Sequence, residues 1–75
     1  MTLAEIRPGN SGTIKRISGR GILMQRLIDM GLYPGVVVSV IRNAPLGDPV
    51  EIEAEGTMVA LRREEARHVE VQIQS

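Results

Sequence analysis

The residues that could carry out chemistry are few and scattered along the chain. There is one histidine, His68, and there is no cysteine. The serines do not lie at a spacing that predicts a nucleophile with a base within hydrogen-bond reach; they are Ser11, Ser18, Ser39 and Ser75. We therefore expect no catalytic residues, and we predict that the protein is not an enzyme.

The best candidate metal ligands are Glu64 and His68, with Glu65 and Glu70 nearby. Glu64 and His68 have the four-residue spacing that brings two side chains together on a helix, and carboxylate and imidazole suit hard or borderline metals. That geometry needs a helix that extends through His68, whereas a strand is predicted to begin near Val69. One imidazole without thiolates predicts at most a weak site shared between molecules, and we expect no cofactor.

Two further patterns resemble functional motifs. Glu51, Glu53 and Glu55 alternate with apolar residues, so they share the outer face of a strand, where water keeps them ionised. Residues 17–21 read Ile-Ser-Gly-Arg-Gly before a helix, but they lack the lysine and the serine or threonine of a nucleotide-binding loop. We interpret the first as a solvated face and the second as a flexible entry into the helix.

The elements that must position any functional surface are organised around one helix from Leu23 to Met30. Leu23, Leu27 and Met30 recur at spacings of three and four residues and therefore share one face of that helix. Met24 and Ile28 widen this face. The helix is therefore predicted to lie on a sheet.

The end of this helix is predicted by Gly31, which can adopt the left-handed conformation. Leu32 can fold back onto Leu27, and Pro34 prevents helical continuation. The chain is therefore expected to turn at 33–35.

Five segments have the apolar alternation or the branched residues of strands. They are 12–17, 36–41, 50–55, 57–61 and 69–74. Ile14 and Ile17 are out of phase for a flat strand, which predicts a bulge near Lys15 or Arg16. Gly56 predicts a hairpin between the third and fourth strands, and short helical turns are expected at 2–6 and 62–67.

Seventy-five residues are enough for one small core, so residues 1–75 are predicted to form a single domain. A single open sheet of five strands would leave its edges unpaired. We therefore predict a mainly β fold: a small SH3-like, partly open antiparallel barrel, with one inserted α-helix that plugs or flanks one end.

The charges balance, with nine lysines and arginines and nine aspartates and glutamates. A small barrel could still bind nucleic acid through a local arginine patch, but such barrels stack bases on aromatic rings, and Tyr33 is the one ring here. No secretory signal and no apolar run of about 20 residues are present. We expect a soluble intracellular protein that binds no nucleic acid.

Three segments together resemble the FeoA family of small ferrous iron transport A proteins. They are Leu-Ile-Asp-Met-Gly-Leu-Tyr-Pro-Gly at 27–35, Arg-Asn-Ala-Pro-Leu-Gly-Asp-Pro at 42–49 and Ala-Leu-Arg-Arg-Glu-Glu-Ala at 60–66. The module also resembles the carboxy-terminal SH3-like domain of some iron-dependent repressors, which is an alternative role. The FeoA resemblance implies a cytoplasmic accessory protein that regulates ferrous iron uptake by binding the cytosolic, GTPase-containing part of the membrane transporter.

A surface for binding protein follows from the width of the helix stripe. Ile22, Met24 and Ile28 cannot all face a sheet together with the rest of the stripe, so some apolar area stays outside. Methionine and an exposed tyrosine suit adaptable contacts and interface anchors. The predicted contact residues, for the transporter or for a second copy of the chain, are Arg20, Met24, Arg26, Ile28 and Tyr33.

Overall fold

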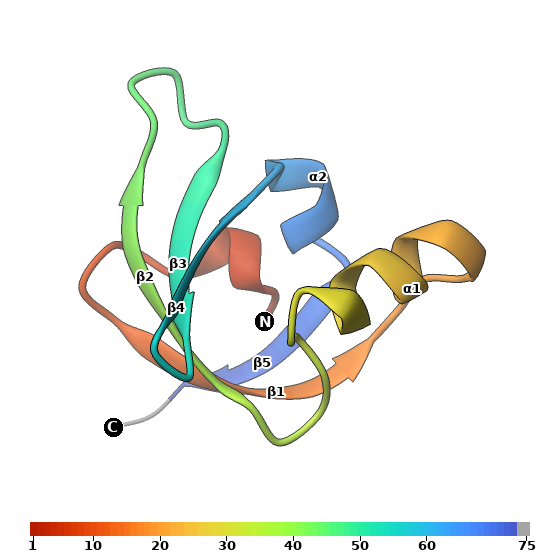
Figure 1. Cartoon of the computed structure of the whole chain (residues 1–75). Coiled ribbons are helices and arrows are strands. Elements are labelled where there is room, and N and C mark those ends of the chain that lie inside the picture. The colour runs from red at the N-terminus through yellow and green to blue at the C-terminus, as the bar shows by residue number, and fades with distance from the viewer. Residues whose placement is uncertain (74–75) are drawn as a thin grey trace.

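The computed structural model describes residues 1–73, which form a five-stranded antiparallel sheet in the order β4-β3-β2-β1-β5. The elements in chain order are η1 (Leu3–Glu5), β1 (Ser11–Ile17), α1 (Gly21–Asp29), β2 (Val37–Asn43), β3 (Val50–Ala54), β4 (Thr57–Leu61), α2 (Arg63–Ala66) and β5 (Val69–Ile73). The sheet curls so that β1 and β5 cross beneath the other three strands, and α1 lies beside one end of it (Figure 1). This is the partly open SH3-like barrel with one inserted helix that the sequence predicts.

The sheet is curled with the help of two bulges. The pairing of β1 with β5 shifts between Ile14 and Arg16, which confirms the predicted bulge and allows both Ile14 and Ile17 to be buried. A second shift, between Val40 and Arg42, lies in the pairing of β2 with β3. The alternation of β2 does not predict it.

The hairpin of β3 and β4 turns on Glu55 and Gly56, both with positive φ, at 50° and 84°. Two such residues in a two-residue loop match the right-handed twist of the strands they join. Gly56 adopts this conformation freely, whereas Glu55 carries a side chain there and is strained.

Branched and aliphatic side chains fill the core. Ile14, Leu27, Leu32, Ile52 and Leu61 are among the largest side chains with almost no exposed surface. The single aromatic ring is outside this core and is 46% exposed. A core without aromatic rings depends on close packing of many small contacts.

The end of α1 has the predicted form. Gly31 has φ 86°, its N–H donates to Ile28 O at 2.9 Å, and Leu32 N–H donates to Leu27 O at 2.9 Å. These two bonds satisfy carbonyls that the last helical turn leaves free, and they bring Leu32 into the core.

Several boundaries differ from the predicted ones. The helix begins at Gly21 rather than Leu23 and ends at Asp29. β2 begins after Val36, because the Val36 N–H donates to Tyr33 O and its carbonyl accepts the Ile14 N–H, so Val36 closes a turn. The short helix α2 covers only four of the six residues expected. Gln74, expected at the end of the last strand, lies outside the described residues.

Hydrogen bonds from Arg63 hold the loop between β2 and β3 in place. Its Nε donates to Gly47 O at 2.7 Å, its Nη1 donates to Ala4 O at 2.7 Å, and its backbone N–H donates to Asp48 Oδ1 at 3.0 Å. One side chain therefore joins the loop, η1 and α2. The sequence gives no signal for this role.

Candidate functional site

The five predicted contact residues lie on α1 and on the turn that follows it. Tyr33 and Ile28 are about half exposed, and Arg20, at the N-cap of α1, is exposed. Met24 is partly buried and packs against the core. Arg26 is exposed but is held in an ion pair. The five residues therefore lie on α1 or beside its ends, but they differ in how far they are available to a partner.

The geometry of α1 separates its exposed apolar side chains into two groups. Leu27 is fully buried, so it marks the side of α1 that faces the core. Because a helix turns about 100° per residue, the directions of the other α1 side chains follow from this reference. Met24 and Ile28, four residues apart, flank the core-facing stripe on one side, and Ile22 and Arg26 flank it on the other. Ile22 is 87% exposed.

Ile22 is an addition to the predicted contact residues. The signal that could have identified it is the true start of the helix at Gly21, which places Ile22 in the first turn. On a helix that began at Leu23 its direction would be undefined.

Arg26 connects α1 to α2. Its Nε lies 3.0 Å from Oε2 of Glu65, whose side chain is only 15% exposed. The other oxygen of Glu65 accepts the backbone N–H of Arg62 at 3.0 Å, so the carboxylate also caps α2. Arg26 therefore positions α1 in addition to lining its surface.

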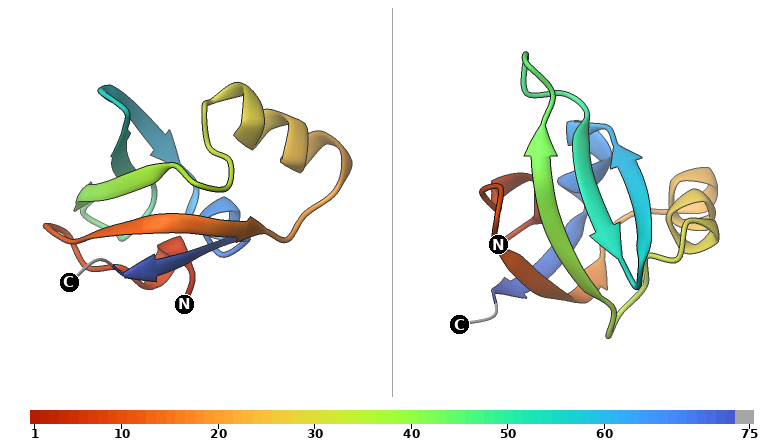
Figure 2. Two further views of the ribbon diagram at one scale, coloured as in Figure 1. Left: turned by 90° about the horizontal axis from the view of Figure 1, so that it is seen from below. Right: turned by 60° about the vertical axis from the view of Figure 1, so that its left-hand side comes forward.

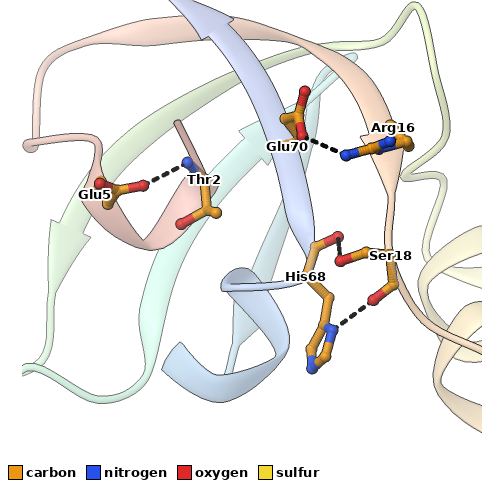
Figure 3. A network of polar contacts seen from close by, with 6 residues as sticks. All are labelled: Thr2, Glu5, Arg16, Ser18, His68 and Glu70. Atoms are coloured by element: carbon orange, nitrogen blue, oxygen red, sulfur yellow. Dashed lines mark hydrogen bonds and ion pairs between the residues drawn. The ribbon is translucent and has the colours of Figure 1, made fainter.

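A second tether joins the segment before α1 to the start of β5. The Ser18 N–H donates to His68 O at 2.7 Å, and the Ser18 hydroxyl lies 3.4 Å from the same oxygen. The His68 ring turns toward the Ser18 carbonyl and bonds to it through Nδ1 (Figure 3). The entry into α1, predicted to be flexible, is thus fixed at one point to the sheet.

The candidate metal ligands Glu64 and His68 line one hollow with Leu23, Arg26, Arg62 and Glu65. They do not share a helix, because α2 ends at Ala66 and β5 begins at Val69. No group of three metal-ligating side chains occurs within residues 1–73. Two arginines in the same hollow oppose a bound cation electrostatically.

Three of the basic side chains, those of Arg16, Arg26 and Arg42, are held in ion pairs. Arg16 pairs with Glu70 at 3.0 Å (Figure 3), and Arg42 pairs with Glu51 at 2.9 Å. These pairs and that of Arg26 lie on different elements of the structure. Each of these cations is partly neutralised by a neighbouring carboxylate, which weakens any local field that would attract a polyanion.

Several exposed apolar side chains outside α1 were not among the predicted contact residues, and Leu46 and Met58 are two of them. Leu46, at the tip of the loop between β2 and β3, is 96% exposed, and Met58 in β4 is 56% exposed. In the sequence, Leu46 stands in a connecting segment rich in proline and glycine, which predicts a loop but no contact role. Met58 lies on the outward face of β4 together with Ala60, whereas Leu61 is buried.

Within the described part of the chain, no helix has both the length and the apolar character needed to cross a bilayer. The longest helix is α1, with nine residues.

The architecture is that of a small SH3-like module, and part of its exposed apolar surface lies on an inserted helix. Comparison with known proteins identifies the family: the FeoA domain model matches residues 1–73, and the chain belongs to the FeoA family, which is associated with ferrous iron transport.

One relative is a fusion of Fe(2+) transport protein A with the Fe(2+) transporter FeoB from Porphyromonas gingivalis. It is 39% identical over 73 residues, which cover 97% of this chain and 9% of that protein. The chain thus spans less than a tenth of this relative.

Two solved structures are also similar. Iron(II) transport protein A from Clostridium thermocellum has a TM-score of 0.94 and 36% identity, covering 97% of this chain and 45% of that one. FeoA of Stenotrophomonas maltophilia, a prokaryotic SH3 domain protein in complex with zinc, has a TM-score of 0.84 and 28% identity. It covers 96% of this chain and 89% of that one. These similarities agree with the SH3-like assignment of the fold.

Proposed function

We propose that the chain is a cytoplasmic accessory protein of ferrous iron uptake that binds the cytosolic, GTPase-containing part of a FeoB-type transporter. The observation that carries this proposal is the exposure of large apolar side chains on α1 and its following turn, namely Ile22, Ile28 and Tyr33. The fusion of the two proteins in the relative from Porphyromonas gingivalis supports the choice of partner.

The physical reason for a protein partner is the exposure of large apolar side chains on one short element. Burial of an exposed isoleucine contributes about 1.5–3 kcal/mol, so Ile22 and Ile28 can contribute substantially to an interface. Tyr33 adds a rigid ring with a polar end, which is typical of interface anchors. The nearby arginines, Arg20 and Arg26, supply a polar rim.

The proposed effect on the transporter is a shift between conformations rather than a chemical step. A bound module changes the equilibrium between two states of a GTPase only by the difference in its affinity for them. A preference of about tenfold for one state corresponds to about 1.4 kcal/mol of coupling, which is in the range of ordinary allosteric regulation.

The test is binding of the chain to the purified transporter and to its isolated cytosolic part. The variant Ile28→Asp with Tyr33→Ala should weaken binding by at least tenfold, because it removes apolar contacts without reaching the core. Met24→Asp is a poorer choice, because Met24 packs against the core and the change would also destabilise the fold.

Ile41→Asp is the matched control. Ile41 is 45% exposed, close to the 43% of Ile28, but it lies on β2. Equal affinity of the α1 variant and the wild-type chain, with both folded, would remove α1 as the contact surface. Equal losses in the α1 and Ile41 variants would indicate a nonspecific effect of the added charge.

A further inference from the structure

The first residues of the chain cover part of one edge of the sheet, whereas the other edge is open. On the outer side of β5, the Val71 N–H donates to Met1 O at 2.8 Å, and Thr2 forms a bridge to Glu70. The chain's own beginning therefore covers part of that edge. β4, at the other end, pairs only with β3 among the strands of residues 1–73, and it forms the outermost strand in Figure 2.

The β4 edge lacks most of the features that usually prevent pairing with another chain. Its sequence, Thr57–Leu61, contains no charged residue and no proline. The two bulges lie in the pairings of β1 and β2 with their neighbours, and the register of β3 with β4 is regular throughout. An uncharged edge without bulges is a ready template for an added strand.

The register of the hairpin identifies which backbone groups are free for pairing. Ala54 and Thr57 close the two-residue turn, so they form a hydrogen-bonded pair, and Ile52 and Val59 form the next one. The N–H and C=O groups of Met58 and Ala60 therefore point away from β3. They present two donors and two acceptors along the open edge.

A hollow beside the end of β4 adds a chemical preference. It is lined by Ala60 of β4, Arg62, Arg26 of α1, and Asp48 and Pro49 of the preceding loop. Arg26 there is already paired with Glu65, whereas the exposed Arg62 forms no ion pair within residues 1–73. The hollow therefore favours a negatively charged side chain from any segment that pairs with the edge.

We propose that an extended segment of the transporter's cytosolic part adds to the sheet as a sixth strand, paired with Met58 and Ala60 of β4. A carboxylate of that segment lies beside Arg62. This inference rests on the proposed function and specifies how the partner is recognised: main-chain hydrogen bonds give affinity, and Arg62 selects an acidic residue.

The first test is a backbone substitution at the edge. Ala60→Pro removes one outward N–H but no bond to β3, a position at which edge strands accept proline. It should weaken binding of the purified transporter by about tenfold, the effect of one lost hydrogen bond and the crowding of the ring. The matched control, Ala60→Ser, keeps the N–H and should bind within about twofold of wild type.

The second test needs no variant, and it shows whether a strand is added to β4 even if Ala60→Pro fails to fold. The full chain is exposed to deuterium with and without the transporter's cytosolic part, and exchange is read for each amide by NMR after dissociation. The Met58 and Ala60 amides should exchange at least tenfold more slowly in the complex. The Val59 amide, already bonded to β3, is the internal reference.

Each result has a distinct meaning. Binding without protection of Met58 and Ala60 overturns the added strand and leaves the proposed function standing. No binding by the intact transporter or its cytosolic part overturns both. Protection that grows with the concentration of the chain alone would show that a second copy occupies the edge, and would also overturn the inference.

Discussion

Replacing Arg63 by alanine should destabilise the protein by about 3 kcal/mol. The substitution removes the bonds from Nε to Gly47 O and from Nη1 to Ala4 O, both at 2.7 Å, and leaves the backbone N–H bond to Asp48 in place. A hydrogen bond from a charged donor contributes about 1.5–3 kcal/mol. Because Arg63 is partly exposed, the lower value applies to each bond.

The assay is urea unfolding followed by circular dichroism. With a slope of about 1 kcal/mol/M for so small a chain, the midpoint of Arg63→Ala should fall by about 3 M. Since total stability at this size is roughly 4–11 kcal/mol, part of the variant population could unfold in water.

Arg62→Ala is the neighbouring control. Arg62 is exposed, and only its backbone N–H takes part in the bond to Glu65, so the change should be within about 0.5 kcal/mol. Arg63→Lys keeps the charge but cannot reach two separate carbonyls with a rigid fork, and it should recover less than half of the loss. Equal midpoints for Arg63→Ala and Arg62→Ala would refute the clamp.

Three further predictions concern single positions. Gly31→Ala should cost about 1–2 kcal/mol in thermal unfolding, because φ there is 86°, and an unchanged midpoint would contradict the left-handed helix end. Glu55→Asn should stabilise the hairpin by about 0.5–1 kcal/mol in the same assay, since asparagine tolerates a positive φ better; a loss of stability would show that the Glu55 side chain is needed. The Thr2 N–H, 2.7 Å from Glu5 Oε1, holds the pKa of the Glu5 carboxyl below its usual value. The stabilisation by the ionised Glu5 carboxylate should therefore be complete above the unfolded-state pKa. It should disappear as the pH falls through the lower folded-state pKa. Glu5→Gln should flatten this part of the plot of stability against pH. In carboxyl NMR of the wild-type chain, a titration midpoint for Glu5 no lower than that of an exposed glutamate would show that the bond is absent in solution.

The strands and the helix end could be predicted because their signals are local. Alternation in 50–55 and 69–73 and the stop at Gly31 lie within a few residues of the structure they specify. The out-of-phase pair Ile14 and Ile17 even identified a bulge. These features depend on neighbouring side chains, whose pattern is visible in the sequence.

The role of Arg63 could not be predicted, because its carbonyl partners lie 16 and 59 residues away. Nothing in the type of a glycine or an alanine marks its carbonyl as an acceptor. The strained φ of Glu55 also departs from the asparagine or glycine that the turn prefers. Non-local backbone bonds and local strain are set by the whole fold.

The contact residues on α1 were predicted as a group, but their individual exposure was not. Periodicity gave a broad apolar stripe, and its width required that some members lie outside. Which side chain lies outside depends on the rotation of the helix, which is set by the burial of Leu27 and by the ion pair of Arg26 with Glu65. The exposure of Ile22 and the partial burial of Met24 follow from that rotation.

The tethers of α1 bear on how so small a surface could bind a partner. Ser18 is bonded to His68 at the start of β5, and Arg26 is paired with Glu65 of α2, so both ends of the contact helix are fixed to the rest of the fold. Fixing these elements before binding removes part of the entropy that an interface must otherwise overcome. A partner that contacts α1 and pairs with β4 would therefore meet two surfaces already held in one arrangement. For a chain with one aromatic ring, such pre-organisation compensates for the scarcity of large anchoring side chains.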